Sequence, residues 1–168
     1  EVEGQLYAEL VIADLEEHRP AFSLKYLLEI HELMFGELYD FAGKFRTVDM
    51  SKGGFAFPSA RFLDASMDGF EKNMLSQIPN QYKNTQEVCG VVGKVHAELL
   101  FIHPFREGNG RVARLFANLM IERAGYKKLN FDLLGEESGF KRYVHAIQQA
   151  SGQNYEPMQK IISEMLDT

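Results

Sequence analysis

Residues 85–124 read TQEVCGVVGKVHAELLFIHPFREGNGRVARLFANLMIERA, and this stretch decides the fold. Apolar side chains recur at helical spacing over 85–102 and again over 109–124, and Gly125 follows as a stop signal. We therefore predict two buried helices that hold the short loop 103–108 between them.

This loop and the first turn of the second predicted helix gather chemically reactive groups. They contain a histidine, a carboxylate, two glycines, an amide and a guanidinium, at His103, Glu107, Gly108, Gly110, Asn109 and Arg111. A helix start presents unpaired N–H groups and a positive dipole end, and glycine lets phosphate oxygens approach the main chain closely. The pattern predicts a phosphate-binding cradle with a base beside it.

Each polar side chain has a functional interpretation and an ordinary structural one. His103, with an ordinary pKa of about 6.5, can accept a proton at neutral pH, although a histidine at a helix end is more often structural. Glu107 supplies an oxygen ligand for Mg²⁺ or merely suits a helix start. Arg111 and Arg114 share a helix face, where they clamp phosphates or form a solvated basic surface. The neighbouring glycines favour the functional interpretation of these residues over the structural one.

Composition limits the classes of function. The chain has 168 residues, 45% of them hydrophobic, which is enough for one buried core, and we expect a single domain. The formal net charge of −6 argues against direct nucleic-acid binding, which needs a basic patch. One cysteine, Cys89, excludes an internal disulfide and fits an intracellular location. No apolar run approaches the roughly 20 residues that span a bilayer, so we expect no membrane contact.

The other side chains around the predicted site have structural interpretations. The four remaining histidines show no spacing typical of zinc ligands, and we interpret His18, His31, His96 and His145 as structural or exposed. Phe105 should anchor the loop in the core.

The rest of the chain is mostly helical in pattern. Further helices are expected over 5–17, 23–34, 59–77, 137–150 and 156–166. Residues 45–57 instead hold two short β-prone runs around Gly53-Gly54, which predicts a β-hairpin flap. Ser23 and Asn84 are the expected helix caps. We predict an all-α fold, a helical core with one small hairpin next to the loop.

The stretch from His103 to Arg114, HPFREGNGRVAR, resembles the signature of Fic-domain proteins, HxFx(D/E)GNGRxxR, at every fixed position. Upstream, 38–44 (LYDFAGK) and 51–55 (SKGGF) resemble the pre-flap and flap segments of bacterial cell-filamentation Fic proteins. The resemblance is strongest over 22–150, and we expect residues 1–168 to form one bacterial Fic domain with the all-α Fic fold.

The resemblance implies a protein adenylyltransferase, which moves AMP from ATP to a Tyr, Thr or Ser hydroxyl of a target protein and releases pyrophosphate. His103 would be the general base, and Glu107 would hold Mg²⁺ between the α- and β-phosphates. The phosphate contacts would come from the backbone of Gly108 and Gly110, and from Asn109 on the α-phosphate, Arg111, and Arg114 on the γ-phosphate. The flap would position the target by strand pairing, through Ser51, Lys52, Gly53, Gly54, Phe55, Ala56 and Phe57.

Regulation is where the chain departs from the family pattern. Many Fic proteins carry an inhibitory (S/T)xxxE(G/N) helix, whose glutamate pairs with the arginine that corresponds to Arg114. Glu3-Gly4 matches the end of that motif, but the spacing to the pre-flap segment is short, and we treat the match as accidental. The inhibitor would then be a separate antitoxin, a helix missing from this chain, or none, which suggests a cytoplasmic toxin or effector.

Two alternatives stay open. Related domains transfer phosphate, phosphocholine or UMP, although the Gly108-Asn109-Gly110 run differs from the Ala-Asn-Lys of Doc-like kinases. A nucleotide-binding or partner-binding module without turnover is the second, and the intact His103 disfavours it.

Overall fold

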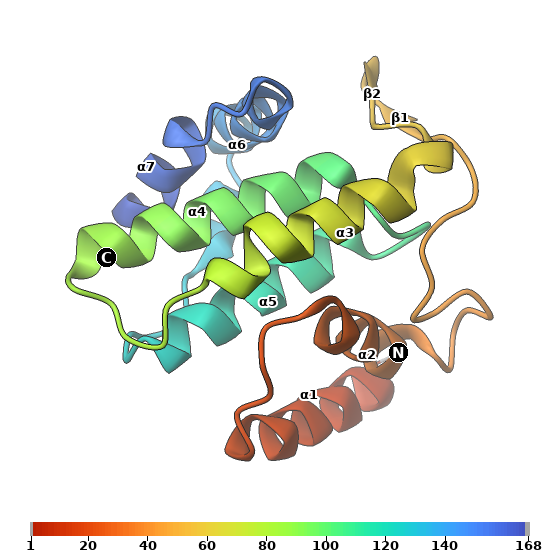
Figure 1. The fold of residues 1–168 in the computed structure, drawn as a ribbon, viewed down its shortest axis with the longest axis horizontal. Helices are drawn as coiled ribbons and strands as arrows, with labels where there is room; N and C mark the ends of the chain where they lie inside the picture. Colours follow the sequence, from red (N-terminus) through yellow and green to blue (C-terminus); the bar gives the residue numbers. More distant parts are fainter. Residues whose placement is uncertain (1, 167–168) are drawn as a thin grey trace.

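A central helix, α4, organises the structure: α3, α5, α6 and α7 pack against it, while α2 packs on α5 and α1 on α2 (Figure 1). The computed structural model describes residues 2–166, except the side chains of 2–5 and 7. The α-helices are α1 (Val2–Glu17), α2 (Leu24–Phe35), α3 (Leu63–Asn73), α4 (Thr85–Ile102), α5 (Asn109–Arg123), α6 (Glu137–Gln149) and α7 (Glu156–Leu166). Within 2–166, no helix is both long and apolar enough to cross a membrane.

The structure confirms the two helices predicted on either side of the loop, α4 and α5, together with the predicted cap of α4 and the predicted stop of α5. Asn84 caps α4, because its Oδ1 accepts the N–H of Glu87 at 2.9 Å. Gly125 ends α5 with a φ of 90°, a conformation that glycine adopts without strain. In the middle of α4, Gly93 lets α7 approach, since a Cβ there would lie 2.6 Å from the Cα of Gln159.

The predicted hairpin flap is confirmed but is shorter than the β-prone stretch. It comprises β1 (Ser51–Lys52) and β2 (Phe55–Ala56), antiparallel, with Ser51 opposite Ala56. The residues before it form no strand. There, the N–H of Arg46 donates to the carbonyl of Pro104 at 2.8 Å, so this segment pairs with the loop 103–108 instead. The hairpin consequently lies at the C-terminal end of α4 (Figure 1).

The prediction of one continuous helix over 59–77 was wrong. The segment divides into η1 (Ala60–Phe62), α3 and η2 (Leu75–Gln77). Asp49 sets the start, because its carboxylate accepts the N–H of Ala60 at 2.7 Å and the hydroxyl of Ser59 at 3.0 Å. At the other end Met74 leaves helical geometry, with φ −126° and ψ −61°. Two further short 3₁₀ turns, η3 (Phe131–Leu134) and η4 (Ala150–Gly152), flank α6.

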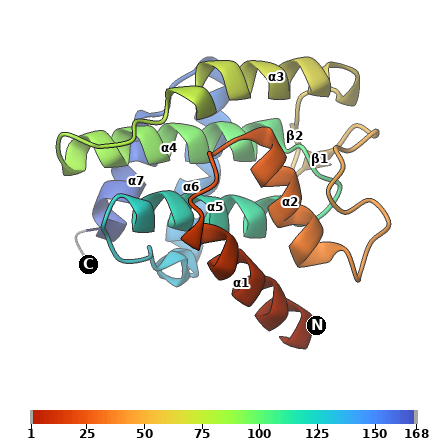
Figure 2. The ribbon, with the colours of Figure 1, turned by 60° about the horizontal axis from the view of Figure 1, so that its bottom comes forward.

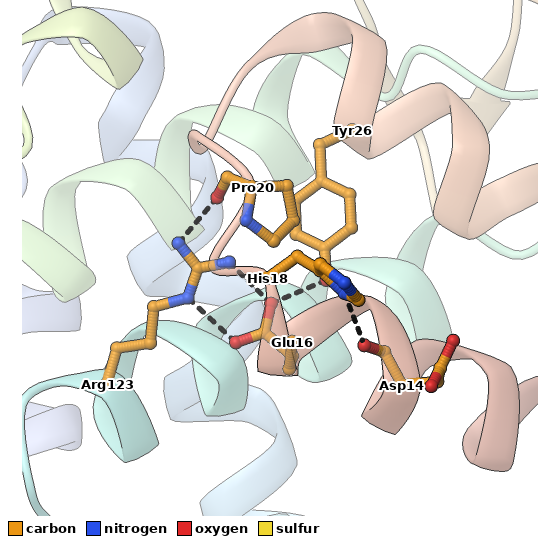
Figure 3. Close-up of polar contacts among 6 residues, drawn as sticks. All are labelled: Asp14, Glu16, His18, Pro20, Tyr26 and Arg123. Carbon is orange, nitrogen blue, oxygen red and sulfur yellow. Dashed lines mark hydrogen bonds and ion pairs between the residues drawn. The ribbon is translucent and has the colours of Figure 1, made fainter.

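A polar cluster fastens α1 to α2 and α5 (Figures 2 and 3). The Arg123 guanidinium donates to both carboxylate oxygens of Glu16, at 2.7 Å for the Nε–Oε2 pair, and to the carbonyl of Pro20 at 2.6 Å. The Tyr26 hydroxyl donates to Glu16 Oε1 at 2.6 Å. The Glu16 and Arg123 side chains are only 19% and 17% exposed, so neither charge has bulk water to replace its partner.

We expect Glu16→Ala to lower the free energy of unfolding by about 2 kcal/mol, because it leaves a half-buried guanidinium unpaired. Urea denaturation measures this loss. Glu137→Ala is the control, since it breaks the exposed Glu137–Lys141 pair, in which water solvates both groups. Equal losses in the two variants would contradict a stabilising role for the cluster.

Candidate functional site

His103 ends α4 in a left-handed conformation, with φ 55° and ψ 58°. Such a backbone is strained for a residue with a Cβ, and it persists only where the surroundings hold it. Its imidazole stacks on the ring of Phe57, next to β2, with centroids 3.8 Å apart and an interplanar angle of 7°. The conformation therefore turns the side chain from the helix to the flap.

The imidazole of His103 is set up to accept a proton. Its Nδ1 lies 3.3 Å from the carbonyl of Leu100 and donates to it, which leaves the lone pair on Nε2. No described residue hydrogen-bonds Nε2. Burial lowers the pKa of His103 to about 4, and the charges of Arg46 and Lys52 act in the same direction, against the Leu100 carbonyl and Glu107. At neutral pH this histidine is an uncharged base.

Asn109 closes the loop on itself. Its Oδ1 accepts the N–H of Phe105 at 2.8 Å, and its Nδ2 donates to the carbonyl of the same residue at 2.6 Å. Phe105 is buried in the core, as expected. One N–H of the Asn109 amide is not used by this pair of bonds, and the predicted contact with an α-phosphate stays a prediction.

His31 ties the loop to the segment before the flap. Its Nδ1 accepts the N–H of Gly43 at 2.9 Å, so Nε2–H donates to the carbonyl of Glu107, also at 2.9 Å. The ring is fully buried and stacks on Phe105 at 3.8 Å. Burial lowers the pKa of His31, which keeps it neutral. The structural interpretation of His31 is confirmed, and its partners place it at the site.

Arg46 is a site residue that the sequence did not reveal. It is only 4% exposed, and its guanidinium bonds four main-chain carbonyls. Nε donates to His103 at 2.6 Å, Nη1 to Val48 at 2.9 Å, and Nη2 to Pro58 at 2.6 Å and Ile102 at 3.2 Å. A lone arginine in a β-prone run gives no local signal of such partners.

Packing and backbone conformation require glycine at position 108, and its predicted role in phosphate binding stays a prediction. Gly108 precedes α5 with a φ of 81°, and a Cβ there would lie 2.4 Å from the Phe35 ring. The close approach is therefore to an aromatic ring of α2. At Gly110, in the first turn of α5, a Cβ would lie 3.0 Å from Nη1 of Arg114.

Glu107, the predicted metal ligand, and Arg111, which is predicted to bind phosphate, lie at the solvent-facing side of the loop. The Glu107 side chain is 51% exposed, accepts the N–H of Gly108 at 3.1 Å and lies 3.5 Å from Nη2 of Arg111. The Arg111 guanidinium is 4.6 Å above the Phe35 ring. Among the described residues no three His, Cys, Asp or Glu side chains cluster as a metal site.

A cavity of about 440 Å³ joins the flap to the end of α4, the start of α5 and one side of α6. From the predicted site it brings together Lys52, Gly53, Phe55, Phe57, His103, Gly110 and Arg114. The other predicted residues do not line it: Ser51, Gly54, Ala56, Glu107, Gly108, Asn109 and Arg111. Arg111 lines a second cavity of about 260 Å³, which α1 borders and which Arg114 also lines.

Tyr143 of α6 is a second cavity residue that sequence reasoning missed. Its hydroxyl donates to Nε2 of His96 at 2.6 Å, while Nδ1 of that histidine donates to the carbonyl of Ala113 at 3.1 Å. Burial lowers the pKa of His96 to about 3 and raises that of Tyr143, so both stay neutral. This buried pair joins α4, α5 and α6 beside Arg114, and the structural interpretation of His96 is confirmed.

The geometry defines a class of protein: a helical domain in which a base and a helix start share one cavity beneath a β-hairpin. Residues 21–121 match the sequence model of the Fic/DOC family, and the chain belongs to that family. The resemblance seen in the motif is thereby confirmed.

Curated relatives carry names of one activity. The protein adenylyltransferase VbhT of Bartonella schoenbuchensis is 31% identical over 105 residues, 62% of this chain and 22% of the relative. The protein adenylyltransferase Fic of Drosophila yakuba is 27% identical over 143 residues, 84% of this chain and 27% of the relative. The chain thus spans about a quarter of the length of these relatives.

Solved structures share the fold. The N-terminal Fic domain of Bep8 from Bartonella sp. 1-1C has a TM-score of 0.76 at 22% identity, over 98% of this chain and 83% of that one. BepC from Bartonella tribocorum, solved with bound AMPPNP, has a TM-score of 0.73 at 23% identity, over 97% and 84%. The predicted Fic fold is confirmed.

We expect Gly108→Ala to destabilise the protein more than Gly54→Ala does. Both glycines have nearly the same positive φ, 81° and 80°, so backbone strain of about 1–2 kcal/mol is common to the two variants. Only at Gly108 does the new methyl group meet the Phe35 ring, whereas nothing lies within 4 Å at Gly54. Thermal unfolding of both variants measures the difference, and equal melting temperatures would contradict the ring contact.

Proposed function

We propose that this chain is the catalytic domain of a protein adenylyltransferase, which transfers AMP from ATP to a hydroxyl group of a target protein and releases pyrophosphate. The observation that carries the proposal is that neutral His103 lines the same cavity as Gly110 and Arg114 at the start of α5. The names of the curated relatives support ATP as the donor and a protein as the acceptor.

In the proposed reaction His103 takes the proton from the target hydroxyl at Nε2. The hydroxyl oxygen forms a bond to the α-phosphorus of ATP, and the bond from that phosphorus to the bridging oxygen of the β-phosphate breaks. Arg111, Arg114 and the main-chain N–H groups at the start of α5 would hold the phosphates. Transfers at phosphorus are catalysed mainly by positioning and by charge stabilisation, which these groups supply.

Glu107 is the residue that would hold Mg²⁺. A single half-exposed carboxylate fits this ion, because Mg²⁺ keeps several waters and takes its other ligands from substrate phosphates. When bound, the ion would neutralise charge on the phosphates. The bond from His31 to the Glu107 carbonyl holds the main chain from which this carboxylate extends.

The hairpin supports strand pairing with the target. Its residues Ser51, Lys52, Gly53, Gly54 and Ala56 are exposed, so the edges of this two-stranded sheet are open to an added strand. Phe57 anchors the hairpin on the imidazole of His103. A hydroxyl carried on a paired segment would therefore approach the base.

Control by a separate antitoxin or by a further inhibitory helix is part of the proposal. The side chains of Glu3 and of the residues beside it lie outside the described part of the chain, so the match of Glu3-Gly4 to the inhibitory motif stays a prediction. The use of ATP favours action in the cytoplasm, and unrestrained transfer to a cellular protein would make the domain a toxin.

Purified protein incubated with Mg²⁺ and ATP labelled at the α-phosphate should label a protein in bacterial lysate. ATP labelled at the γ-phosphate should give no labelled protein, because that phosphate leaves with pyrophosphate. His103→Ala should lose the α-label by at least about 100-fold, the usual contribution of a general base. Autoradiography of the separated proteins measures all three reactions.

Signal from the γ-label alone would replace the proposal with kinase activity. Nucleotide binding without any transfer would favour a binding module. The same two proteins test the toxin proposal, because cells that express the wild type should grow more slowly than cells that express His103→Ala, and equal growth would contradict it.

Nuclear magnetic resonance should find the His103 imidazole still neutral at pH 5.5, where a histidine with an ordinary pKa of about 6.5 is largely protonated. Burial lowers its pKa to about 4, so the charged form should appear only near that pH. The folded state is expected to lose stability as the pH falls from about 6.5 toward these lowered pKa values, because the unfolded chain binds protons that the folded His31, His96 and His103 resist. Circular dichroism at each pH checks folding, and a midpoint near 6.5 in folded protein would contradict the prediction.

A further inference from the structure

The buried Arg46 guanidinium lies between the flap and the end of α4. All four of its side-chain hydrogen bonds go to main-chain carbonyls, and no ion pair involves it among the described residues. Burial accordingly lowers the pKa of Arg46. A cation in such a place is costly unless its donors are satisfied, and only the five-donor fork of arginine can reach four carbonyls at once.

The four carbonyls belong to two groups. Those of Val48 and Pro58 lie on either side of the hairpin, one before β1 and one after β2. Those of Ile102 and His103 lie at the end of α4, where carbonyls have no partner within the helix. The Arg46 side chain therefore fixes the two ends of the hairpin against the main chain of His103.

The opposite end of the loop is held by other residues. Asn109 bonds the main chain of Phe105, and His31 bonds the carbonyl of Glu107. The start of α5, where phosphates are proposed to bind, follows this second end. The contacts of Arg46 thus concern the base and the flap rather than the phosphate cradle.

We propose that Arg46 is a positioning residue, which holds the imidazole of His103 at a fixed place relative to the flap, so that a hydroxyl on a flap-paired segment meets Nε2. This inference rests on the proposed function. Arg46 acts through the carbonyls of His103 and Pro58 and through the stacking of Phe57, and it does not line the cavity that holds His103. Displacing a reacting group by about 1 Å is enough to slow a reaction by roughly 100-fold.

The test compares Arg46→Lys and Arg46→Gln with Arg123→Lys as a matched control. Arg123 is also a partly buried, multiply bonded arginine, but it lies at the far end of α5 in the cluster with Glu16 (Figure 3). Each protein is measured for melting temperature, ATP affinity, rate of AMP transfer at saturating ATP, and the proton shifts of the His103 ring. In the wild type the Phe57 ring, stacked at 3.8 Å, should displace those shifts upfield.

Both Arg46 variants should lose the upfield shift and transfer AMP about 10- to 100-fold more slowly, while ATP affinity changes by less than about threefold. Arg123→Lys should keep the shift and the rate even where its melting temperature falls equally. The charged groups that face His103 are Arg46, Lys52 and Glu107. Arg46→Lys keeps this charge balance and Arg46→Gln does not, so the second variant should raise the pKa of the imidazole more than the first.

An unchanged ring shift in Arg46→Lys, or a rate loss that Arg123→Lys shares at equal stability, would overturn the proposal. Unfolding of both Arg46 variants under conditions where Arg123→Lys stays folded would also overturn it, in favour of a purely structural arginine. If the wild type transfers no AMP, the proposed function is refuted. If the ring shift is nevertheless lost only in the Arg46 variants, the positioning of His103 by Arg46 stays supported.

Discussion

Five carbonyl groups between residues 102 and 107 accept hydrogen bonds from three side chains and one main-chain N–H, and the site depends on these bonds. The Arg46 guanidinium donates to the carbonyls of Ile102 and His103, and the main-chain N–H of the same residue donates to the carbonyl of Pro104. The Asn109 side chain donates to the carbonyl of Phe105, and the His31 ring donates to the carbonyl of Glu107. A buried carbonyl without a partner costs free energy, so these donors fix the path of the loop. That path leads the chain into α5 with its first N–H groups free of helical partners.

The donors come from distant parts of the sequence. His31 is 76 residues from its partner Glu107, and Arg46 is 57 residues from His103. Both precede the flap, on α2 and on the segment that follows it. The amino-terminal third of the chain must therefore be folded against α4 and α5 before the loop has its shape. The same contacts make the position of the flap and the position of the base interdependent.

Sequence reasoning predicted the features that depend on local pattern. Helix stripes, the caps at Ser23 and Asn84, the stop at Gly125 and the hairpin turn follow from neighbours a few residues away, and the structure confirms them. Arg46 and Tyr143 were missed because their partners lie far along the chain, and a bond to a distant carbonyl leaves no periodic signal. The helix predicted over 59–77 was wrong because its first turn is a 3₁₀ helix and Met74 leaves helical geometry, and the apolar pattern signals neither break.

The burial of His103 has two opposing consequences for its proposed role as a base. A pKa of about 4 keeps the imidazole neutral at physiological pH, but it also makes the nitrogen a weaker proton acceptor. A loose transition state at phosphorus tolerates a weak base, because little charge builds on the attacking oxygen before the bond to phosphorus forms. Orientation of the hydroxyl then matters more than basicity. Bound phosphates would in addition favour the imidazolium and raise the pKa, so that the base gains strength when the nucleotide is in place.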